Sequence, residues 1–458
     1  MLFSNCRGPE NKPRRPNILF FLVDDQRNDT LGCAGFPVLQ TPHIDALARN
    51  GIRFLNTFVT TSICAASRAS ILTGLYERTH GYTFGTLPLS QASCMNSYPV
   101  LFRKNGYRTG FIGKFGVTIE SGQLQQLFDY FRPLDRNPYF KIQEDGSLRH
   151  TTELAGDYAI EFLKSQPQNE PFCLSVSFNA VHAEDSDKEN HYPYPFAVKN
   201  YYKERAMPLP RLSEDTFFSS QPDFLKHSLN RERFFWRWDT REKYDRNMRS
   251  YLRMLSGVDS VIGRIRKALE TCKLGDNTIV IYSADNGYYM GDRGFAGKWS
   301  HYEESLRIPL IIYDPDFSGL EKGKEIDSIA LNIDLAPTML DFAGVAIPDI
   351  YQGRSLRPLF RHDQPFRWRT DFFCEHLMSH SKIPKWEGVH SQRYVYARYF
   401  EQDPVYEFLH DLERDPDQSK NFSDQPEYKT VLEKMRHRCT NYVNRYKRII
   451  TGDAKEDM

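Results

Sequence analysis

The stretch 61–74 carries the residues best suited to chemistry. Cys64 follows an apolar approach and precedes small and apolar residues at helical spacing, so it lies near the start of a predicted helix. Free backbone N–H groups and the helix dipole favour an anion at that end. Arg68, one turn further on, adds a planar donor fork suited to an oxyanion. The spacing predicts a nucleophile beside an anion site. A buried structural cysteine is the alternative, since free cysteines are commonly buried.

Two polar groups follow strongly apolar runs. The run 17–23 ends in Asp24 and Asp25, and the run 278–284 ends in Asp285 and Asn286. Adjacent carboxylates at the end of a core strand repel each other and cost stability unless a cation relieves them. Carboxylate and amide oxygens, without histidine or cysteine, suit Ca²⁺ or Mg²⁺ rather than zinc. The groups therefore predict a hard-cation site, with solvated turns as the alternative.

Further apolar runs predict the elements that position these residues. The runs 108–113, 172–178 and 308–313 are predicted strands, and apolar positions between 248 and 269 recur at helical spacing. Strands that alternate with helices predict an α/β fold with a large, mostly parallel sheet flanked by helices. Lys114 and His182 follow two of these strands, and open α/β sheets bind ligands at the carboxyl ends of their strands. One common site is expected there.

The pattern changes towards the C-terminus. Alternating segments near 372–373 and 394–399 predict half-exposed strands, and 426–446 predicts a final helix. We therefore expect an N-terminal tail at 1–15, a catalytic domain at 16–360 and a smaller C-terminal α+β domain at 361–458. Residues 184–244 lack strong periodicity, which predicts either a loop-rich insertion at the mouth of the cleft or an ordinary solvated surface.

Several motifs resemble those of one enzyme family. Residues 64–68, CAASR, resemble the signature C-x-P-S-R of the formylglycine-dependent sulfatases, and 69–74 have the family's usual continuation, ASILTG. Residues 41–48 resemble the segment TPNLDxLA, and 406–416 resemble the ending LYDLxxDP. The resemblance extends over nearly the whole chain. It implies the alkaline-phosphatase-like fold and the hydrolysis of sulfate esters.

The resemblance also implies a role for each motif residue. Cys64 would be oxidised to formylglycine by a maturase, and its hydrated aldehyde would attack sulfur. Arg68, Lys114 and Lys298 would bind the sulfate oxygens as charge grows. His182 would protonate the departing alcohol, a task suited to imidazole. The ligands of the cation, Ca²⁺ or Mg²⁺, would be Asp24, Asp25, Asp285, Asn286 and the modified Cys64.

Two positions depart from the family pattern. Ala66 stands where the signature has proline, and Gly116 stands where the family motif GKWH has a histidine that helps to turn over the sulfated intermediate. His80, His301 or a water molecule is expected to substitute for that histidine. These departures suggest one alternative, a weakly catalytic lipoprotein that binds sulfated glycans. A phosphate ester hydrolase with the same fold is a separate alternative from the same superfamily.

The expected substrate is a sulfated sugar within a glycan. Aromatic rings can stack on sugars and arginine can pair with sulfate, so we assign substrate contact to four residues. They are Arg237, His301, His376 and Trp386.

Bulk properties exclude several other classes. Lys and Arg number 60 against 59 Asp and Glu in 458 residues, so no global field marks a nucleic-acid binder. The eight cysteines include no C-x-x-C pair, which argues against zinc and redox motifs, and no apolar run could span a bilayer. Residues 1–6 resemble the end of a bacterial lipoprotein signal with Cys6 as the lipid-bearing residue; a disordered tail is the alternative. An exported protein, periplasmic or attached to the outer membrane, is expected.

Overall fold

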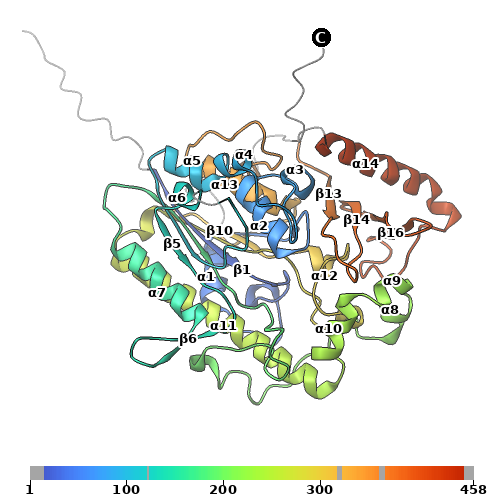
Figure 1. Ribbon diagram of the computed structural model, residues 1–458, viewed down its shortest axis with the longest axis horizontal. Coiled ribbons are helices and arrows are strands. Elements are labelled where there is room, and N and C mark those ends of the chain that lie inside the picture. The colour runs from blue at the N-terminus through green and yellow to red at the C-terminus, as the bar shows by residue number, and fades with distance from the viewer. Residues whose placement is uncertain (1–14, 121–122, 317–321, 361–366, 448–458) are drawn as a thin grey trace, which may run out of the picture.

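The computed structural model describes residues 15–120, 123–316, 322–360 and 367–447. Its centre is an eight-stranded sheet in the order β11-β2-β10-β9-β1-β8-β4-β5 (Figure 1). The bounds are β1 (Asn17–Val23), β2 (Ile52–Phe54), β4 (Arg108–Gly113), β5 (Tyr130–Pro133), β8 (Phe172–Ser177), β9 (Thr278–Ala284), β10 (Leu310–Tyr313) and β11 (Lys324–Ile326). Five of the seven strand pairings are parallel, which confirms the predicted mostly parallel sheet.

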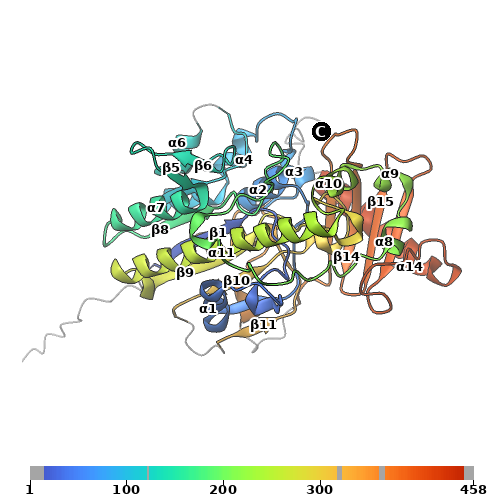
Figure 2. The ribbon, with the colours of Figure 1, turned by 90° about the horizontal axis from the view of Figure 1, so that it is seen from below.

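Strand β1 is buried on both faces because helices cover each side of the sheet (Figures 1 and 2). Alternate side chains point to opposite faces, so Leu19 and Phe21 enter one core and Ile18 and Phe20 enter the other. The first core is closed by α1 (Pro42–Asn50), α7 (Thr151–Lys164) and α11 (Arg241–Thr271). The second is closed by α2 (Cys64–Thr73), α5 (Tyr98–Lys104) and α13 (Leu335–Phe342).

Strand β10 differs from the expectation. It runs antiparallel to both β9 and β2, whereas the sequence grouped it with the parallel strands. Its carboxyl end therefore lies at the opposite edge of the sheet from the carboxyl ends of β1 and β9. Because a strand buried on both faces is continuously apolar in either direction, its sequence does not reveal its orientation.

The C-terminal region forms a separate antiparallel sheet with a long helix beside it (Figure 2). The strands β13 (Asp371–His376), β14 (Trp386–Ser391), β15 (Tyr394–Tyr399) and β16 (Tyr406–Asp411) pair in sequence order, and α14 (Lys429–Lys447) packs on them. The expected smaller α+β unit is confirmed. Of the four strands, β14 and β16 were not anticipated as strands.

Shorter elements complete the described part of the fold. They are β3 (Thr57–Phe58) paired with β12 (Ala330–Leu331), β6 (Phe140–Ile142) paired with β7 (Leu148–His150), and the helices α3 (Glu77–His80), α4 (Gln91–Met95), α6 (Leu124–Leu127), α8 (Asp215–Ser219), α9 (Asp223–Lys226), α10 (Leu229–Arg237) and α12 (Glu303–Leu306). The stretch 184–244 is therefore loop-rich only in its first half, since α8, α9 and α10 and the start of α11 occupy the second.

Three expectations about the chain's organisation stay predictions. Cys6 and the lipoprotein-like start lie outside the described residues, as do 361–366 at the predicted domain boundary. Membrane attachment and an exported location are therefore not addressed by the structure. Among the residues it describes, no helix combines the length and apolar character needed to cross a membrane.

Candidate active site

Four adjacent parallel strands deliver polar side chains to one edge of the sheet. Asp24 and Asp25 directly follow β1, Asp285 follows β9, Lys114 follows β4, and the segment that follows β8 carries His182. Because β9, β1, β8 and β4 are neighbours with a common direction, their carboxyl ends meet there. The convergence predicted from the sequence is therefore present in the fold.

Backbone hydrogen bonds fix the segment after β8 against the end of β1. Asp24 donates its N–H to the carbonyl of Ala180 at 3.0 Å, and Val181 donates to the carbonyl of Asp24 at 2.8 Å. The Tyr139 hydroxyl donates to the carbonyls of Asn179, at 2.8 Å, and His182, at 2.6 Å. These bonds continue the strand pairing for several residues and hold the imidazole beside the carboxylates.

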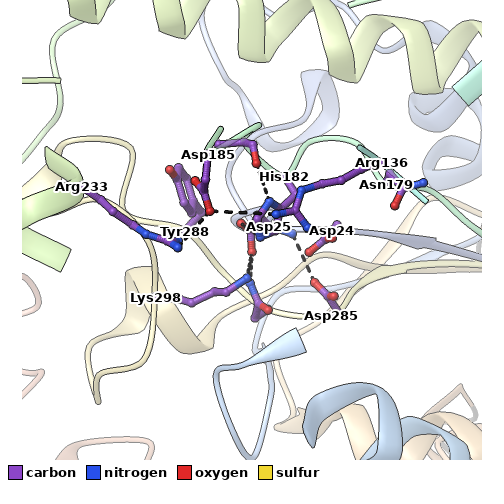
Figure 3. Close-up of polar contacts among 12 residues, drawn as sticks. Asp24, Asp25, Arg136, Asn179, His182, Asp185, Arg233, Asp285, Tyr288 and Lys298 are labelled. Carbon is purple, nitrogen blue, oxygen red and sulfur yellow. Dashed lines mark hydrogen bonds and ion pairs between the residues drawn. The ribbon is translucent and has the colours of Figure 1, made fainter. Parts of the chain in front are cut away.

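The carboxylates form a compact, fully buried cluster with amide and ammonium groups (Figure 3). Asp25 donates its N–H to Oδ1 of Asp285 at 3.2 Å, and Nδ2 of Asn286 donates to Oδ1 of Asp25 at 2.6 Å. Lys298 forms an ion pair with Asp25. Lys114 forms another with Asp24, so each member of the aspartate pair has its own cation.

The surrounding cations decide which carboxylates are ionised. Burial opposes ionisation of Asp24, but Lys114, His182, Lys298 and Arg68 together hold the pKa of this carboxyl well below its usual range. Asp285 is different, because burial and then the negative charge of Asp24 raise its pKa to about 6. One site thus holds a carboxylate that is firmly ionised beside one that gains a proton easily.

The residues present fit a hard divalent cation. Oδ1 of Asp24 and Oδ1 of Asn286 are buried and make no hydrogen bond within the described residues. Ligand atoms of Asp24, Asp25 and His182 lie within 4.8 Å of one another. Unsatisfied buried oxygens are costly, and oxygen donors of this kind are preferred by Ca²⁺ and Mg²⁺. These oxygens belong to predicted ligands, and His182 is a neighbour that the prediction did not include; the ligand set itself stays a prediction.

Helix α2 brings Cys64 and Arg68 to the same edge. Cys64 is the first residue of the helix and is 5% exposed. Arg68 donates from Nε to Oδ2 of Asp285 at 2.8 Å and from Nη1 to Oγ of Ser177 at 2.6 Å. Its Nη2 is buried and has no partner among the described residues, so one donor of the fork stays free. Cys64 lies close enough to Arg68 and Lys298 for its charge to act on both.

The imidazole of His182 faces the cluster with one nitrogen. Nδ1 lies 2.8 Å from the carbonyl of Ala183, and Nε2 lies 3.7 Å from Oδ2 of Asp25. Burial, and after it the positive charge of Arg136, lowers the pKa of His182 well below its usual value. The Nδ1 contact sets the orientation of the ring and leaves Nε2 directed at the site.

A second charged group, formed by Arg136, Asp185 and Arg233, lies beside His182 (Figure 3). Arg233 donates to Asp185 at 2.9 Å, and Arg136 pairs with the same carboxylate at 4.0 Å. The side chains of Arg136 and Asp185 are each 25% exposed, so solvent reaches this group. Asp185 could have been noticed three residues after His182, but Arg136 lies in a loop after β5 that carries no motif.

The four predicted substrate contacts are all fully buried. Arg237 pairs with Asp185 and its Nη1 lies 3.4 Å from the Tyr288 hydroxyl, so it supports the charged group from behind. Trp386 donates to the carbonyl of Trp299 at 2.8 Å, and His376 forms the end of β13 opposite it. This placement does not support direct contact with a sugar. Rings and guanidinium groups serve interior packing as well as they serve sugars, and residue type alone did not separate the two.

Neither histidine proposed to replace the missing family residue contacts the carboxylate cluster. His80 uses Nε2 towards Ser70 and Nδ1 towards the N–H of Tyr82. His301 lies against the C-terminal sheet with its nitrogens 2.9 Å from the Tyr399 hydroxyl and 3.1 Å from Nε2 of His410. These positions do not favour a catalytic role for either ring.

Gly116 itself is closely packed. Its φ is +68°, and an added Cβ would lie 2.8 Å from Cδ of Arg68. A side chain at this position would therefore strain the backbone and displace the Arg68 arm. The backbone conformation and the packing against Arg68 therefore favour glycine over the family histidine at this position.

Comparison with known proteins identifies the family to which this site belongs. The sequence model described as Sulfatase matches residues 16–345. This chain belongs to the sulfatase family. A second model, N-sulphoglucosamine sulphohydrolase C-terminal, matches residues 291–445 of the same sulfatase.

Individual relatives are similar over most of their length. An N-acetylglucosamine-6-O-sulfatase of Bacteroides thetaiotaomicron is 29% identical over 93% of this chain and 86% of its own. An ulvan-active sulfatase of Formosa agariphila is 27% identical over 92% of this chain and 80% of its own. A solved structure described as a complex with its substrate, D-glucosamine-2-N,6-O-disulfate, superimposes with a TM-score of 0.81 and 25% identity, and covers 97% of this chain and 100% of its own. The protein is a sulfatase with the alkaline-phosphatase-like fold.

Proposed function

We propose that the protein hydrolyses the 6-O-sulfate ester of a glucosamine residue in a glycan, with formylglycine derived from Cys64 as nucleophile and a bound Ca²⁺ or Mg²⁺. The observation that carries the chemistry is the buried cluster of Asp24, Asp25 and Asp285 with Lys114 and Lys298 beside the start of α2. The sugar is suggested by the similarity to an N-acetylglucosamine-6-O-sulfatase and to the glucosamine disulfate complex.

Maturation must precede catalysis. A maturase oxidises the Cβ of Cys64 to an aldehyde, sulfur leaves as sulfide, and an external oxidant such as dioxygen takes up the electrons. Water adds to the aldehyde and gives a geminal diol. The diol lies at the N-terminus of α2, where the helix dipole and the free N–H groups favour the ionised oxygen.

The catalytic cycle then consists of two displacements. One diol oxygen attacks sulfur while the bond from sulfur to the sugar oxygen breaks. Because the Nδ1 proton of His182 is held by the carbonyl of Ala183, Nε2 takes up a proton from water before this step and passes it to the departing alcohol. The second hydroxyl next gives its proton to a water molecule, the bond from carbon to the sulfate oxygen breaks, and the aldehyde is restored as sulfate leaves. Arg68, Lys114 and Lys298 are placed to bind the charged oxygens in both steps.

The cation would be held by Asp24, Asp25, Asp285 and Asn286 with the matured Cys64, and it would supply Lewis-acid polarisation of a sulfate oxygen. Cationic side chains of the protein hold these carboxylates before a metal ion binds. Lys114 keeps Asp24 ionised, and Arg68 binds Asp285, so the carboxylates stay in place at the end of their strands.

The charged group beside His182 is suited to the sugar. Asp185 accepts hydrogen bonds, while the buried Nε atoms of Arg136 and Arg233 have no partner within the described residues. A cavity of 640 Å³, lined in part by Lys114, Gly116 and Arg136, opens next to the site. Of this charged group, Arg136 lines the cavity, and Asp185 pairs with Arg136 at 4.0 Å. A sugar whose sulfate lies at the carboxylate cluster would therefore meet the Arg136 guanidinium beside its remaining substituents.

A sulfate-release screen tests this proposal, with protein whose Cys64 conversion has been verified by mass. The substrates are N-acetylglucosamine 6-O-sulfate, its 3-O-sulfate isomer, galactose 6-O-sulfate and N-acetylglucosamine 6-phosphate. We expect the first to be hydrolysed fastest and Cys64→Ala to release nothing. Preference for another sulfated sugar would overturn the assigned substrate, and preference for the phosphate ester would overturn the assigned reaction.

The sugar contacts can be tested separately. Arg136→Ala should raise KM for the 6-O-sulfated sugar, because one guanidinium donor beside the substrate is lost. Arg132→Ala is the matched control, since that side chain is 51% exposed on the neighbouring strand. Equal KM values for both variants would show that Arg136 does not contact the sugar.

A further inference from the structure

A second cavity, of 640 Å³, lies away from the carboxylate cluster. Its lining residues come from the segments 349–354 and 367–372, from α14 and from Tyr76. Asp349 and Asp371 supply its carboxylates, so five arginines face two acids in a protein whose net charge is only +1. The arginines are Arg354, Arg367, Arg369, Arg438 and Arg445.

Helix α2 separates this cavity from the active site. The helix begins with Cys64, and the carbonyl of Gly74, just beyond its last residue, accepts hydrogen bonds from the N–H groups of Gln352 at 2.9 Å and Gly353 at 3.1 Å. A ten-residue helix rises about 15 Å. The cavity therefore lies at the opposite end of α2 from the nucleophile and plays no part in the chemistry there.

Two of the five arginines form ion pairs within the protein, and the other three form none with the part of the chain that the structure describes. Arg369 pairs with the buried Asp334, and Arg438 pairs with Asp371 at 2.8 Å. The guanidinium groups of Arg354, Arg367 and Arg445 form no ion pair or hydrogen bond with any described residue, and all three residues are exposed. Unpaired guanidinium groups gathered at one cavity repel one another, which is a cost unless an anion binds.

Aromatic rings and a hydroxyl lie among these charges. Arg438 stacks over the ring of Tyr442 at 4.6 Å, and Arg369 stacks over Trp368 at 4.7 Å. Burial raises the pKa of Tyr446, while a hydrogen bond with Tyr76 and the charges of Arg445, Arg369 and Arg354 act against that rise. Three guanidinium groups thus act on one tyrosine hydroxyl at the cavity.

We propose that this cavity is a second binding site for a sulfated glycan chain. The arginine forks match the oxygens of sulfate groups, and the ring surfaces can cover the apolar faces of the sugars between them. A chain held here stays near the active site, which raises the effective concentration of its sulfate esters at Cys64. The choice of a sulfated glycan as occupant rests on the proposed function, whereas the cavity and its unpaired arginines do not.

The test separates binding from catalysis. Arg354→Glu, Arg367→Glu and Arg445→Glu are combined in one variant, with Lys164→Glu, an exposed lysine at the end of α7, as the control for loss of positive charge. Binding to heparin and to a de-sulfated heparin is measured by calorimetry at two salt concentrations. Hydrolysis is measured on a sulfated monosaccharide and on a long sulfated chain, and thermal melting checks the fold.

We expect the triple variant to bind heparin at least about tenfold more weakly than the wild type, with a smaller salt dependence. Its KM for the long chain should rise by a similar factor, and its kcat/KM for the monosaccharide should be unchanged. Equal heparin affinity of the wild type and the triple variant would overturn the proposal. DNA serves as a second polyanion, and a wild-type affinity for DNA equal to that for heparin would also overturn it, because the site would then bind any polyanion. If the monosaccharide is not hydrolysed at all, the proposed function fails while the heparin result still decides this site.

Discussion

Two clusters of three buried carboxylates are stabilised in different ways in this protein. One is the active-site cluster of Asp24, Asp25 and Asp285, at the strand ends. The other, the junction cluster, consists of Glu77, Glu375 and Glu387, where α3 meets the C-terminal sheet. Arg78 binds Glu375 through its N–H at 2.9 Å and through Nε at 2.8 Å, and it also pairs with Glu387.

The difference lies in what compensates each charge. In the active-site cluster, cations lower the pKa of Asp24 below its usual range. In the junction cluster, burial and the neighbouring Glu375 raise the pKa of Glu77 to about 8, and burial raises that of Glu375 to about 7. A proton thus neutralises part of the junction. At the active site Asp24 keeps its charge and its Oδ1 is unsatisfied, although burial raises the pKa of Asp285 there to about 6. Retained charge marks the site for chemistry, and neutralised charge marks a structural contact.

Removal of divalent cations should have the largest effect, and it should act on the active-site cluster and not on the junction cluster. Thorough chelation should abolish sulfate release and lower the melting temperature, because Asp24, Asp25 and Asp285 then lose the metal ion and keep only their cationic side-chain partners. Added Ca²⁺ or Mg²⁺ should restore both. The double variant Asp25→Asn, Asp285→Asn should melt at the same temperature with and without chelator. Unchanged melting and activity of the wild type at verified zero metal content would remove the cation from the account.

His182→Ala should come next in size. A sugar alkoxide needs a proton to leave, so kcat/KM on a sulfated sugar should fall by about 10²–10⁴-fold. The loss should be much smaller on a nitrophenyl sulfate, whose leaving group departs unaided. His227→Ala, on the exposed end of α9, is the control. Equal losses on both substrates would assign His182 to sulfate binding or to structure.

Substitution of the cationic side chain that pairs with each cluster should have a different effect in the two clusters. Lys298→Ala should lower kcat/KM by about 10²–10³-fold, as expected when a charge that stabilises the transition state is removed. Arg78→Ala should leave kcat/KM nearly unchanged and lower the free energy of unfolding by about 3–5 kcal/mol, because the buried Glu375 loses its cationic partner and Glu387 keeps only Arg398. Activity measurements and urea denaturation of both variants test the pair. A reversed pattern would mean that the junction, not the strand ends, supports turnover.

The smallest expected effect is a pH dependence of stability. Glu77 has a pKa of about 8 in the folded protein and an ordinary value of 4.5, so the folded state binds more protons between those values. The free energy of unfolding should therefore fall as pH rises from 5 to 8, by about 1 kcal/mol per pH unit. Glu77→Gln should flatten this slope, and the exposed Glu433→Gln should not. Urea denaturation at pH 5.5 and pH 8 measures the free energy of unfolding of the wild type and the two variants. The same change with pH in all three proteins would show that Glu77 does not cause it.

The sequence predicted the active-site cluster well for a physical reason. Strands buried on both faces are long apolar runs, so the polar residues that end them stand out in the sequence and converge in a parallel sheet. Asp24 and Asp285 were found in this way. The substrate side could not be found so, because Arg136 and Asp185 meet through loops that have no periodicity and come from different strands.

The incorrect or unsupported expectations share one cause. The antiparallel direction of β10, and the burial of Trp386 and His301 against the C-terminal sheet, depend on contacts between segments far apart in the chain. The type of a residue shows that the side chain carries a ring or a positive charge, but it does not show which part of the protein that side chain contacts. The junction cluster was missed for the same reason, since Glu77 and Glu375 approach each other only when α3 packs against the C-terminal sheet.

The central claim is that matured Cys64, held at the strand ends, is the nucleophile. The most direct measurement determines the fraction of aldehyde at Cys64 by peptide mass in a series of preparations made with increasing amounts of maturase, and compares it with the rate of sulfate release. The account predicts that the rate rises in proportion to the aldehyde fraction and extrapolates to zero for the unmodified thiol. Full activity in a preparation that contains only the thiol would contradict it.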